Sequence, residues 1–359
     1  MSQDSARSAP HAAVVFHPGK ADVERLRQIV TAQGRAAGWA PPRWYPTQPE
    51  DSGRGAAQDA VDDKPAVVLV AGGDGTVRAA AGVLQGTGVP IALIPAGTGN
   101  LLARELGVAL ADLDTAVSAA FSGCERRIDV AVADLSDSGG EWTSHAFVVM
   151  AGIGLDADMA ANTNARAKKH LGWLAYVSPI ARSVFANRLF RIDYRIDGSR
   201  SRTERAHTVI VGNCGTLAGN MLLIPRASID DGFLDVVMMR PRGRLGWAGI
   251  GSRLTLQGAA RRSRLTRRIL ARAPELHSLA YARGRVFEAT FEVPRVVQLD
   301  GDSFGHVSAA RITVRPGALL IRVRKSDPET APVSGAAPRT LSDDPEHEGP
   351  DGQHDADDS

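Results

Sequence analysis

The chain of 359 residues is poor in cysteine, since only Cys124 and Cys214 occur and they lie far apart. This scarcity argues against a disulfide scaffold and a cysteine zinc site, and it favours a reducing compartment. A convincing membrane-spanning run is also missing. Residues 207–225 carry no charge, but their glycines and proline would break a membrane helix, so they predict buried strands and turns. Residues 1–10 are polar and lack the apolar core of a signal peptide.

Lysine is scarce as well, with five residues, and most of the positive charge comes from arginine. The net charge of +2 hides an asymmetry: residues 326–359 carry −9, which leaves +11 on residues 1–325. Few apolar residues occur in this acidic tail, so we expect it to be disordered. The length and the apolar fraction of 43% suit a globular chain of two domains.

The first third of the chain alternates short apolar runs with segments of helical spacing. The expected strands are 12–16, 66–71 and 90–94, and the expected helices are 22–32, part of 48–64, one that follows Thr76 to about Leu84 and one that starts at 101–106. This alternation predicts a parallel α/β sheet with helices on both faces, a three-layer arrangement.

After residue 130 the pattern changes to short strands separated by turn residues. The expected strands are 146–151, 190–196, 208–211, 234–239, 286–293, 296–299 and 312–314, with helical stretches near 159–185 and 245–273. Such a pattern is typical of an antiparallel, β-sandwich-like domain.

Two glycine-rich loops follow consecutive buried strands, Gly72-Gly73-Asp74-Gly75-Thr76 and Pro95-Ala96-Gly97-Thr98-Gly99-Asn100. Loops at the carboxyl ends of parallel strands are the usual ligand sites of such sheets, and their glycines let backbone N–H groups approach phosphate oxygens. Asp74 could face a metal ion or a transferred phosphoryl group. Thr98 or Asn100 could cap the next helix, whose N-terminus would favour an anion. The loops match neither a P-loop nor a dinucleotide fingerprint.

In this order, the two loops resemble those of the diacylglycerol kinase catalytic-domain family, which includes bacterial lipid kinases and sphingosine kinases. The similarity continues through Gly152-Ile153-Gly154-Leu155-Asp156-Ala157, Leu171-Gly172 with Ala175-Tyr176, Val211-Gly212-Asn213, Pro225 with Ala227, Asp230-Asp231-Gly232-Phe233-Leu234-Asp235 and Leu299-Asp300-Gly301-Asp302. Several motifs in family order are far more specific than one.

The resemblance implies an α/β ATP-binding domain at 11–126, completed by a returning strand at 317–325, and a β-rich lipid-binding domain at 127–316. It implies ATP and Mg²⁺ as cofactors and the transfer of the γ-phosphate to a lipid hydroxyl. The residues it places at the nucleotide are His17, Gly72, Gly73, Asp74, Gly75, Thr76, Gly97, Thr98, Gly99, Asn100 and Asp302.

The resemblance also implies that Asp300 is the base that takes the hydroxyl proton, with Asp74 as a second catalytic carboxylate. From the residues alone, Asp-Gly after a strand more often marks a hairpin turn. Asp129, Asp230 and Asp231 are candidate metal ligands, although a strand edge and a plain turn explain them equally well.

Two positions depart from the family pattern. His17 stands where the family usually has asparagine, which puts its contact with nucleotide in doubt. Asp302 replaces a glutamate, so its side chain is one methylene shorter and its partner is expected to differ.

Ten arginines and no acidic residue occur between 240 and 272, with a cluster at Arg261, Arg262, Arg264, Arg267 and Arg268. A helix there would be basic on one side and apolar on the other, which suits an anionic membrane surface, although a solvated face is the plain alternative. Nucleic acid is a further candidate partner, but the aromatic interleaving that favours it is missing and Trp247 stands alone, so we expect no nucleic-acid binding. We therefore expect a cytoplasmic protein that associates peripherally with membranes.

Two other functions compete with the lipid kinase. NAD kinases share Gly-Gly-Asp-Gly-Thr, but the Asn-x-Glu element that follows it in those enzymes is missing here. A catalytically silent nucleotide- or lipid-binding regulator could use the same scaffold. The sequence identifies neither the lipid nor the oligomeric state, so a homodimer stays open.

Overall fold

The computed structural model describes residues 9–154, 189–214, 227–240 and 279–325. The predicted helical stretches at 159–185 and 245–273, the arginine cluster at 261–268 and the tail at 326–359 lie outside the described residues. All statements below concern the described part of the chain.

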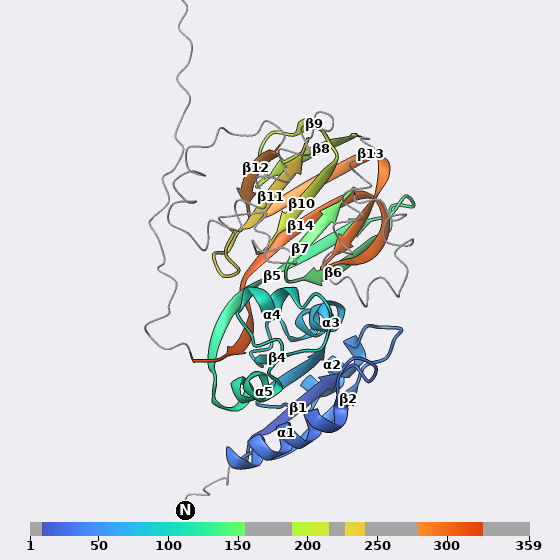
Figure 1. Cartoon of the computed structure of the whole chain (residues 1–359). Helices are drawn as coiled ribbons and strands as arrows, with labels where there is room; N and C mark the ends of the chain where they lie inside the picture. Colours follow the sequence, from blue (N-terminus) through green and yellow to red (C-terminus); the bar gives the residue numbers. More distant parts are fainter. Residues whose placement is uncertain (1–8, 155–188, 215–226, 241–278, 326–359) are drawn as a thin grey trace, which may run out of the picture. The chain divides into compact units, whose positions relative to one another are not determined.

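The N-terminal part is a three-layer α/β domain with a parallel sheet, as predicted (Figure 1). Its elements are β1 (His11–Phe16), α1 (Val23–Ala36), β2 (Ala40–Pro46), α2 (Arg54–Asp62), β3 (Val67–Gly72), α3 (Asp74–Leu84), β4 (Ile91–Pro95), α4 (Leu101–Glu105) and α5 (Leu113–Ser122). The strands lie in the order β4-β3-β1-β2 and pair in parallel.

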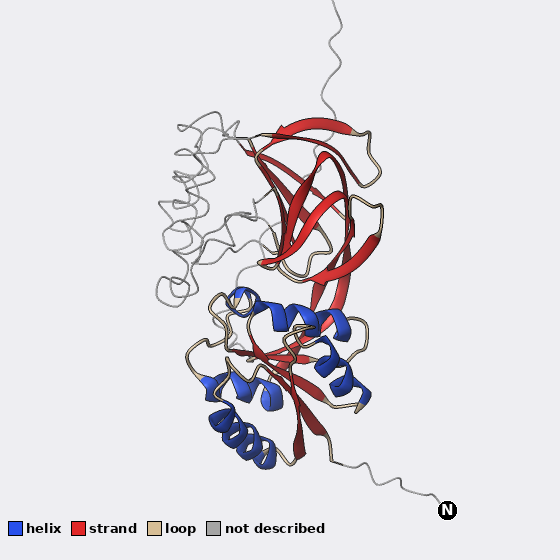
Figure 2. Cartoon of the chain, turned by 90° about the vertical axis from the view of Figure 1, so that its right-hand side faces the viewer, coloured by secondary structure: helices blue, strands red, loops and turns tan. Residues whose placement is uncertain are grey.

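Both faces of this sheet are covered because successive side chains of a strand point to opposite sides. Ala13 and Val15 of β1 pack with buried residues of α2, α3 and α4. Ala12 and Val14 pack with buried residues of α1 and α5. Figure 2 shows helices on both sides of these strands.

The sequence reasoning missed β2 and α5. Strand β2 contains Pro41, Pro42 and Pro46, which lack the N–H donor of a central strand. It lies at the end of the sheet and pairs only with β1, where prolines are tolerated.

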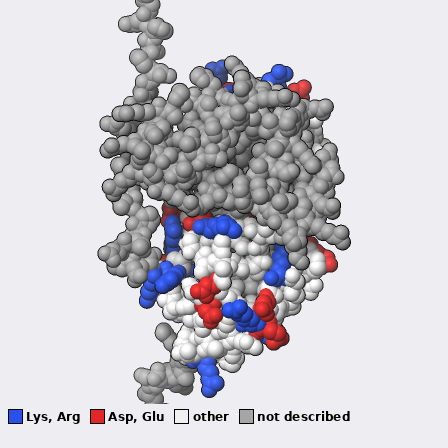
Figure 3. All heavy atoms as spheres, viewed as in Figure 1, with Lys and Arg blue, Asp and Glu red and all other residues white. Residues whose placement is uncertain are grey.

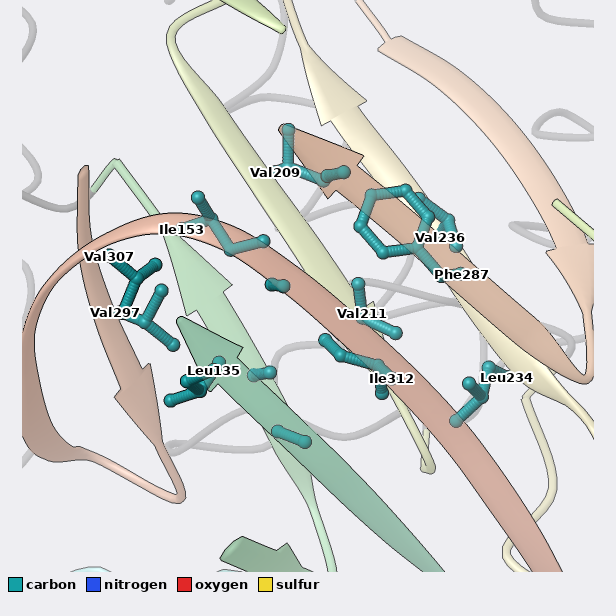
Figure 4. Packing of buried hydrophobic residues seen from close by; sticks show 14 of the residues in the cluster. Leu135, Ile153, Val209, Val211, Leu234, Val236, Phe287, Val297, Val307 and Ile312 are labelled. Carbon is teal, nitrogen blue, oxygen red and sulfur yellow. The ribbon is translucent and has the colours of Figure 1, made fainter. Parts of the chain in front are cut away.

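The C-terminal part is an antiparallel β-sandwich-like domain. Its strands are β5 (Cys124–Ser136), β6 (Trp142–Phe147), β7 (Met150–Ile153), β8 (Phe190–Ile196), β9 (Arg202–Ala206), β10 (Thr208–Gly212), β11 (Leu234–Met239), β12 (Leu279–Gly284), β13 (Val286–Leu299) and β14 (Asp302–Val323). Its core is a cluster of buried side chains that includes Val209, Val236, Phe287 and Ile312 (Figure 4).

In this part the sequence reasoning missed β5, β9 and β12, and three strand predictions were wrong in detail. The expected strand 312–314 is only the middle of β14. The expected strand 146–151 is divided into β6 and β7, because the intervening amide groups bond to a side chain and not to a neighbouring strand. The expected strands 286–293 and 296–299 are one strand, β13, which passes through Pro294 with a shift of register against β14.

Strand β14 joins the two parts of the chain. It pairs antiparallel with β5 and β13, and its end pairs in parallel with β4, where Ile321 lies opposite Ile91. The described sheet is therefore continuous through β14.

The connection between α5 and β5 generates a stability prediction. Gly123 has a φ of −69°, which suits any residue, but an added Cβ would collide with the carbonyl oxygens of Ala119 and Val323. We expect Gly123→Ala to lower the free energy of unfolding by about 1–3 kcal/mol, as overpacking does. Urea unfolding measures this, with Gly19→Ala as the control because its Cβ would lie 3.5 Å from the nearest atom. Equal midpoints for the two variants would contradict the prediction.

Candidate functional site

The two glycine loops begin side by side at one edge of the parallel sheet. Gly72 at the end of β3 lies opposite Pro95 at the end of β4, and the amide of Ala96 donates to the carbonyl of Gly72 at 3.1 Å. A Cβ on Gly97 would lie 2.6 Å from the Cα of Gly73. The close approach of the two loops therefore requires glycine at 97.

Asp74, the first residue of α3, ties the first loop to the second. Its carboxylate accepts hydrogen bonds from the amides of Asn100 at 3.0 Å and Leu101 at 2.6 Å. Burial raises the pKa of Asp74 above its ordinary value, against these two hydrogen bonds. The carboxylate predicted to serve phosphoryl transfer thus also fixes the backbone of the neighbouring loop.

Of the two expected caps, Asn100 occupies the N-cap position of α4, but its side chain does not cap the helix. Asn100 makes no side-chain cap on α4, and its amide group bonds instead to the N–H and C=O of Gly97 within its own loop. Asp74 takes the first amides of α4. Thr98 is exposed.

The first loop also touches the hairpin that contains Asp302. A Cβ on Gly75 would lie 2.7 Å from Oδ2 of Asp302, so the carboxylate lies directly against the loop. The same oxygen accepts a hydrogen bond from Arg78 of α3 at 2.7 Å. Arg78 is thus the partner of the shortened acidic side chain. The side chain of Thr76, by contrast, is buried beneath Gly72.

The loop after β1 lies at the same edge. The ring of His17 accepts the amide of Gly19 through Nδ1 at 3.1 Å and so stabilises its own turn. Lys20 in this turn places its Nζ 3.4 Å from where a Cβ on Gly73 would stand. A lysine ammonium beside the first glycine loop is suited to neutralise phosphate.

Asp300 and Gly301 form the two-residue turn that joins β13 to β14, with φ values of 49° and 92°. The hairpin interpretation of Asp-Gly is therefore confirmed. The side chain of Asp300 nevertheless points inward, and the residue is only 4% exposed. Its Oδ2 accepts the amide of Val148 at 2.9 Å, and its Oδ1 accepts those of Val149 at 2.8 Å and Met150 at 3.0 Å.

Burial raises the pKa of Asp300 to about 6, although the three amide hydrogen bonds and the charge of Arg78 act in the opposite direction. The carboxyl is therefore mainly ionised at pH 7. Because its pKa is higher in the folded state, its contribution to stability is largest below the unfolded pKa near 3.9 and is lost as the pH rises through about 6.

Asp129, Asp230 and Asp231 are close enough to influence one another, but each already has partners. Asp129 is buried and accepts the amides of Gly232 and Gly317, both at 2.7 Å. Asp230 pairs with Arg126, and Asp231 pairs with Arg283. No group of three or more His, Cys, Asp or Glu side chains forms a metal-ligand cluster within the described ranges. Their role at a metal stays a prediction.

Asn213 links the neighbourhoods of Asp129 and Asp300. Its Nδ2 donates to the carbonyls of Asp129 and Val148, both at 3.0 Å, and the residue is fully buried. Val148 in turn donates its amide to Asp300. One buried amide side chain therefore connects strand β5 to the segment that holds the Asp300 carboxylate.

The sequence reasoning gave no role to Lys20, Arg78 or Asn213. The turn containing Lys20 follows a strand of the same parallel sheet, so the sequence could have indicated that this turn lies near the glycine loops. Position 78 lies one helical turn after Asp74, and the substitution at Asp302 pointed to a changed partner without naming it. Only the fold reveals that Asn213 connects β5 to the segment between β6 and β7.

Among the described residues, no helix is long and apolar enough to cross a membrane. Acidic and basic side chains alternate on the described surface that faces the viewer in Figure 3.

Two family models match the chain. Residues 11–133 match the diacylglycerol kinase catalytic domain, and residues 148–323 match the YegS C-terminal NAD kinase β-sandwich-like domain. A protein of Stenotrophomonas maltophilia, described as a probable YegS-like lipid kinase, is 30% identical over 284 residues, which cover 77% of this chain and 84% of that protein.

The diacylglycerol kinase of Mycobacterium tuberculosis is 31% identical over 181 residues, or 49% of this chain, and the chain spans about half of that relative (56%). The fold is shared with a crystal structure of a diacylglycerol kinase from Bacillus anthracis, with a TM-score of 0.66, 23% identity and coverage of 90% of this chain and 99% of that one. The chain therefore belongs to the lipid kinase family that combines a diacylglycerol kinase catalytic domain with a YegS C-terminal domain.

Proposed function

We propose that the protein transfers the γ-phosphate of Mg·ATP to the hydroxyl of diacylglycerol or a related lipid alcohol. The observation that carries this proposal is the pair of glycine loops at the carboxyl ends of β3 and β4, held together by Asp74. This edge of a parallel sheet is where ligands bind, and its backbone can approach phosphate closely.

The chain offers the charges that phosphoryl transfer needs around these loops. Lys20 and Arg78 supply positive charge beside the first loop. Asp74 and Asp302 would hold Mg²⁺ through their carboxylate oxygens, the ligand type that suits it, and the bound metal would supply positive charge against the phosphates of the nucleotide.

Asp300 is the proposed base. The lipid hydroxyl oxygen would form a bond to the γ-phosphorus while the bond to the ADP oxygen breaks, and the hydroxyl proton would pass to the Asp300 carboxylate. Its Oδ2 accepts one amide, so this oxygen keeps capacity for a proton. Because the residue is 4% exposed, the proposal requires the acceptor to displace the residues that cover it.

The first test is the transfer of labelled γ-phosphate from Mg·ATP to diacylglycerol micelles, to other lipid alcohols and to NAD. We expect label in a lipid and a decrease in kcat of about 10²–10⁴-fold for Asp300→Asn, because a general base is lost. Asp137→Asn is the matched control: its carboxylate also accepts backbone amides in a hairpin turn, but it is exposed. Label in NAD alone would favour an NAD kinase, and ATP binding without any transfer would favour a silent regulator.

The raised pKa of Asp300 generates a pH prediction. A protonated carboxyl cannot accept a proton, so kcat at saturating substrates should fall about tenfold per pH unit below about pH 6 and reach a plateau above it. A neutral lipid alcohol as acceptor keeps the substrate hydroxyl from titrating in this range. A kcat that stays constant from about pH 5 to pH 7 would show that another group takes the proton.

The proposed acceptor lies in a membrane, so the proposal includes docking through the arginines of 261–268. Each such residue contributes about 1 kcal/mol near an anionic surface. Replacing Arg261, Arg262, Arg264, Arg267 and Arg268 by Glu should abolish sedimentation with acidic liposomes, while neutral liposomes serve as the control. Unchanged binding to acidic liposomes would remove this part of the proposal.

A further inference from the structure

A hollow of about 260 Å³ lies along α3. Helix α3 contributes Arg78 and Gly82, its C-cap residue Gln85 follows at the spacing of the same helical face, and β6 contributes Ser144 and His145. A Cβ on Gly82 would lie 3.4 Å from Ala146 of β6, so the two elements are close at this level.

The lining is strongly basic. Arg54 from the first turn of α2, Arg78 from α3 and Arg315 from β14 all reach the hollow, and no acidic residue lies among the described residues that line it. Asp302 pairs with Arg78, and the charge of Asp134 acts on His145. Neither Arg54 nor Arg315 has a carboxylate partner in the described part of the chain, so positive charge remains uncompensated.

Arg78 has unused hydrogen-bonding capacity. Its side chain is only 12% exposed, and its Nε is buried without a partner among the described residues. A buried donor of this kind costs stability unless something accepts its hydrogen bond. Burial lowers the pKa of His145, and the charges of Arg78 and Arg54 lower it further. Both arginines therefore exert a positive potential inside the hollow.

These features match a phosphate group better than other anions. Guanidinium groups that approach from three elements can bond several oxygens of a tetrahedral dianion, and Ser144 and His145 add neutral polar contacts. We propose that this hollow is a second phosphate-binding site, which takes the phosphate of a small molecule or of a lipid headgroup. This inference does not depend on the acceptor proposed above.

The hollow and the glycine loops lie at different positions along α3. Gly82 and Gln85 lie eight and eleven residues after Asp74, which corresponds to about 12 and 16 Å along α3. Arg78 nevertheless connects the two regions, because its partner Asp302 lies against Gly75. A phosphate in the hollow would compete with Asp302 for Arg78.

Calorimetric titration of the full chain with inorganic phosphate tests the proposal. We expect binding of one phosphate, weakened about tenfold or more in Arg54→Gln and in Arg315→Gln, because each removes a charged hydrogen-bond donor. Arg311→Gln is the matched control: it lies on the same strand as Arg315, outside the hollow, beside Glu288. Arg54 and Arg315 are exposed, so both variants should keep the thermal unfolding midpoint of the parent.

Titration with glycerol 3-phosphate distinguishes the sources of the phosphate. Tighter binding than that of inorganic phosphate, with the same dependence on Arg54 and Arg315, assigns the site to a headgroup, and equal binding assigns it to free phosphate. No phosphate binding by the parent, or equal losses in Arg311→Gln and Arg315→Gln, would overturn the proposal. The proposal would also be overturned if ATP displaced phosphate one for one and Arg315→Gln lost ATP affinity to the same extent as phosphate affinity. The hollow would then belong to the nucleotide site.

Discussion

Hydrogen bonds from backbone amides to three aspartates hold the described structure together where its loops meet. Asp74 accepts the amides of Asn100 and Leu101, Asp129 accepts those of Gly232 and Gly317, and Asp300 accepts those of residues 148–150. A carboxylate can satisfy several donors that no neighbouring strand reaches, and charge-assisted bonds are stronger than neutral ones. Each aspartate thus fixes a segment distant in sequence, at the cost of burying a charge.

These hydrogen bonds give the carboxylates of the site a structural role in addition to a chemical one. The carboxylates that the family resemblance assigns to chemistry are the same ones that position the loops, so a substitution at Asp74 or Asp300 changes geometry and charge together. Asp300 combines a tight turn, a buried side chain and a pKa raised to about 6. Burial and hydrogen bonding act on it in opposite directions, and burial is the larger effect. A base that is ionised at pH 7 yet weakly solvated follows from this balance.

The parallel sheet and both glycine loops were predictable because buried strands such as β3 read as continuous apolar runs and glycine marks their ends. The edge strand β2 was missed because its three prolines resemble a loop. The break between β6 and β7 was missed because it depends on Asp300, about 150 residues away. Contacts between distant segments, such as Arg78 with Asp302 and Asn213 with Val148, leave no local pattern in a sequence. Motifs identified which residues matter, and only the fold showed what each one touches.

The central claim is that the Asp300 carboxyl, although bonded to three amides, stays titratable near neutral pH because burial outweighs those bonds. A ¹³C NMR titration of the protein labelled at the aspartate carboxyl carbons measures this directly, and Asp300→Asn assigns the resonance. The account predicts that a carboxyl resonance that titrates near pH 6 in the parent is missing in the variant, whereas Asp235, whose pKa burial also raises to about 6, keeps its resonance. If the Asp300 resonance titrates at or below the ordinary value of about 3.9, hydrogen bonding outweighs burial and the account is contradicted.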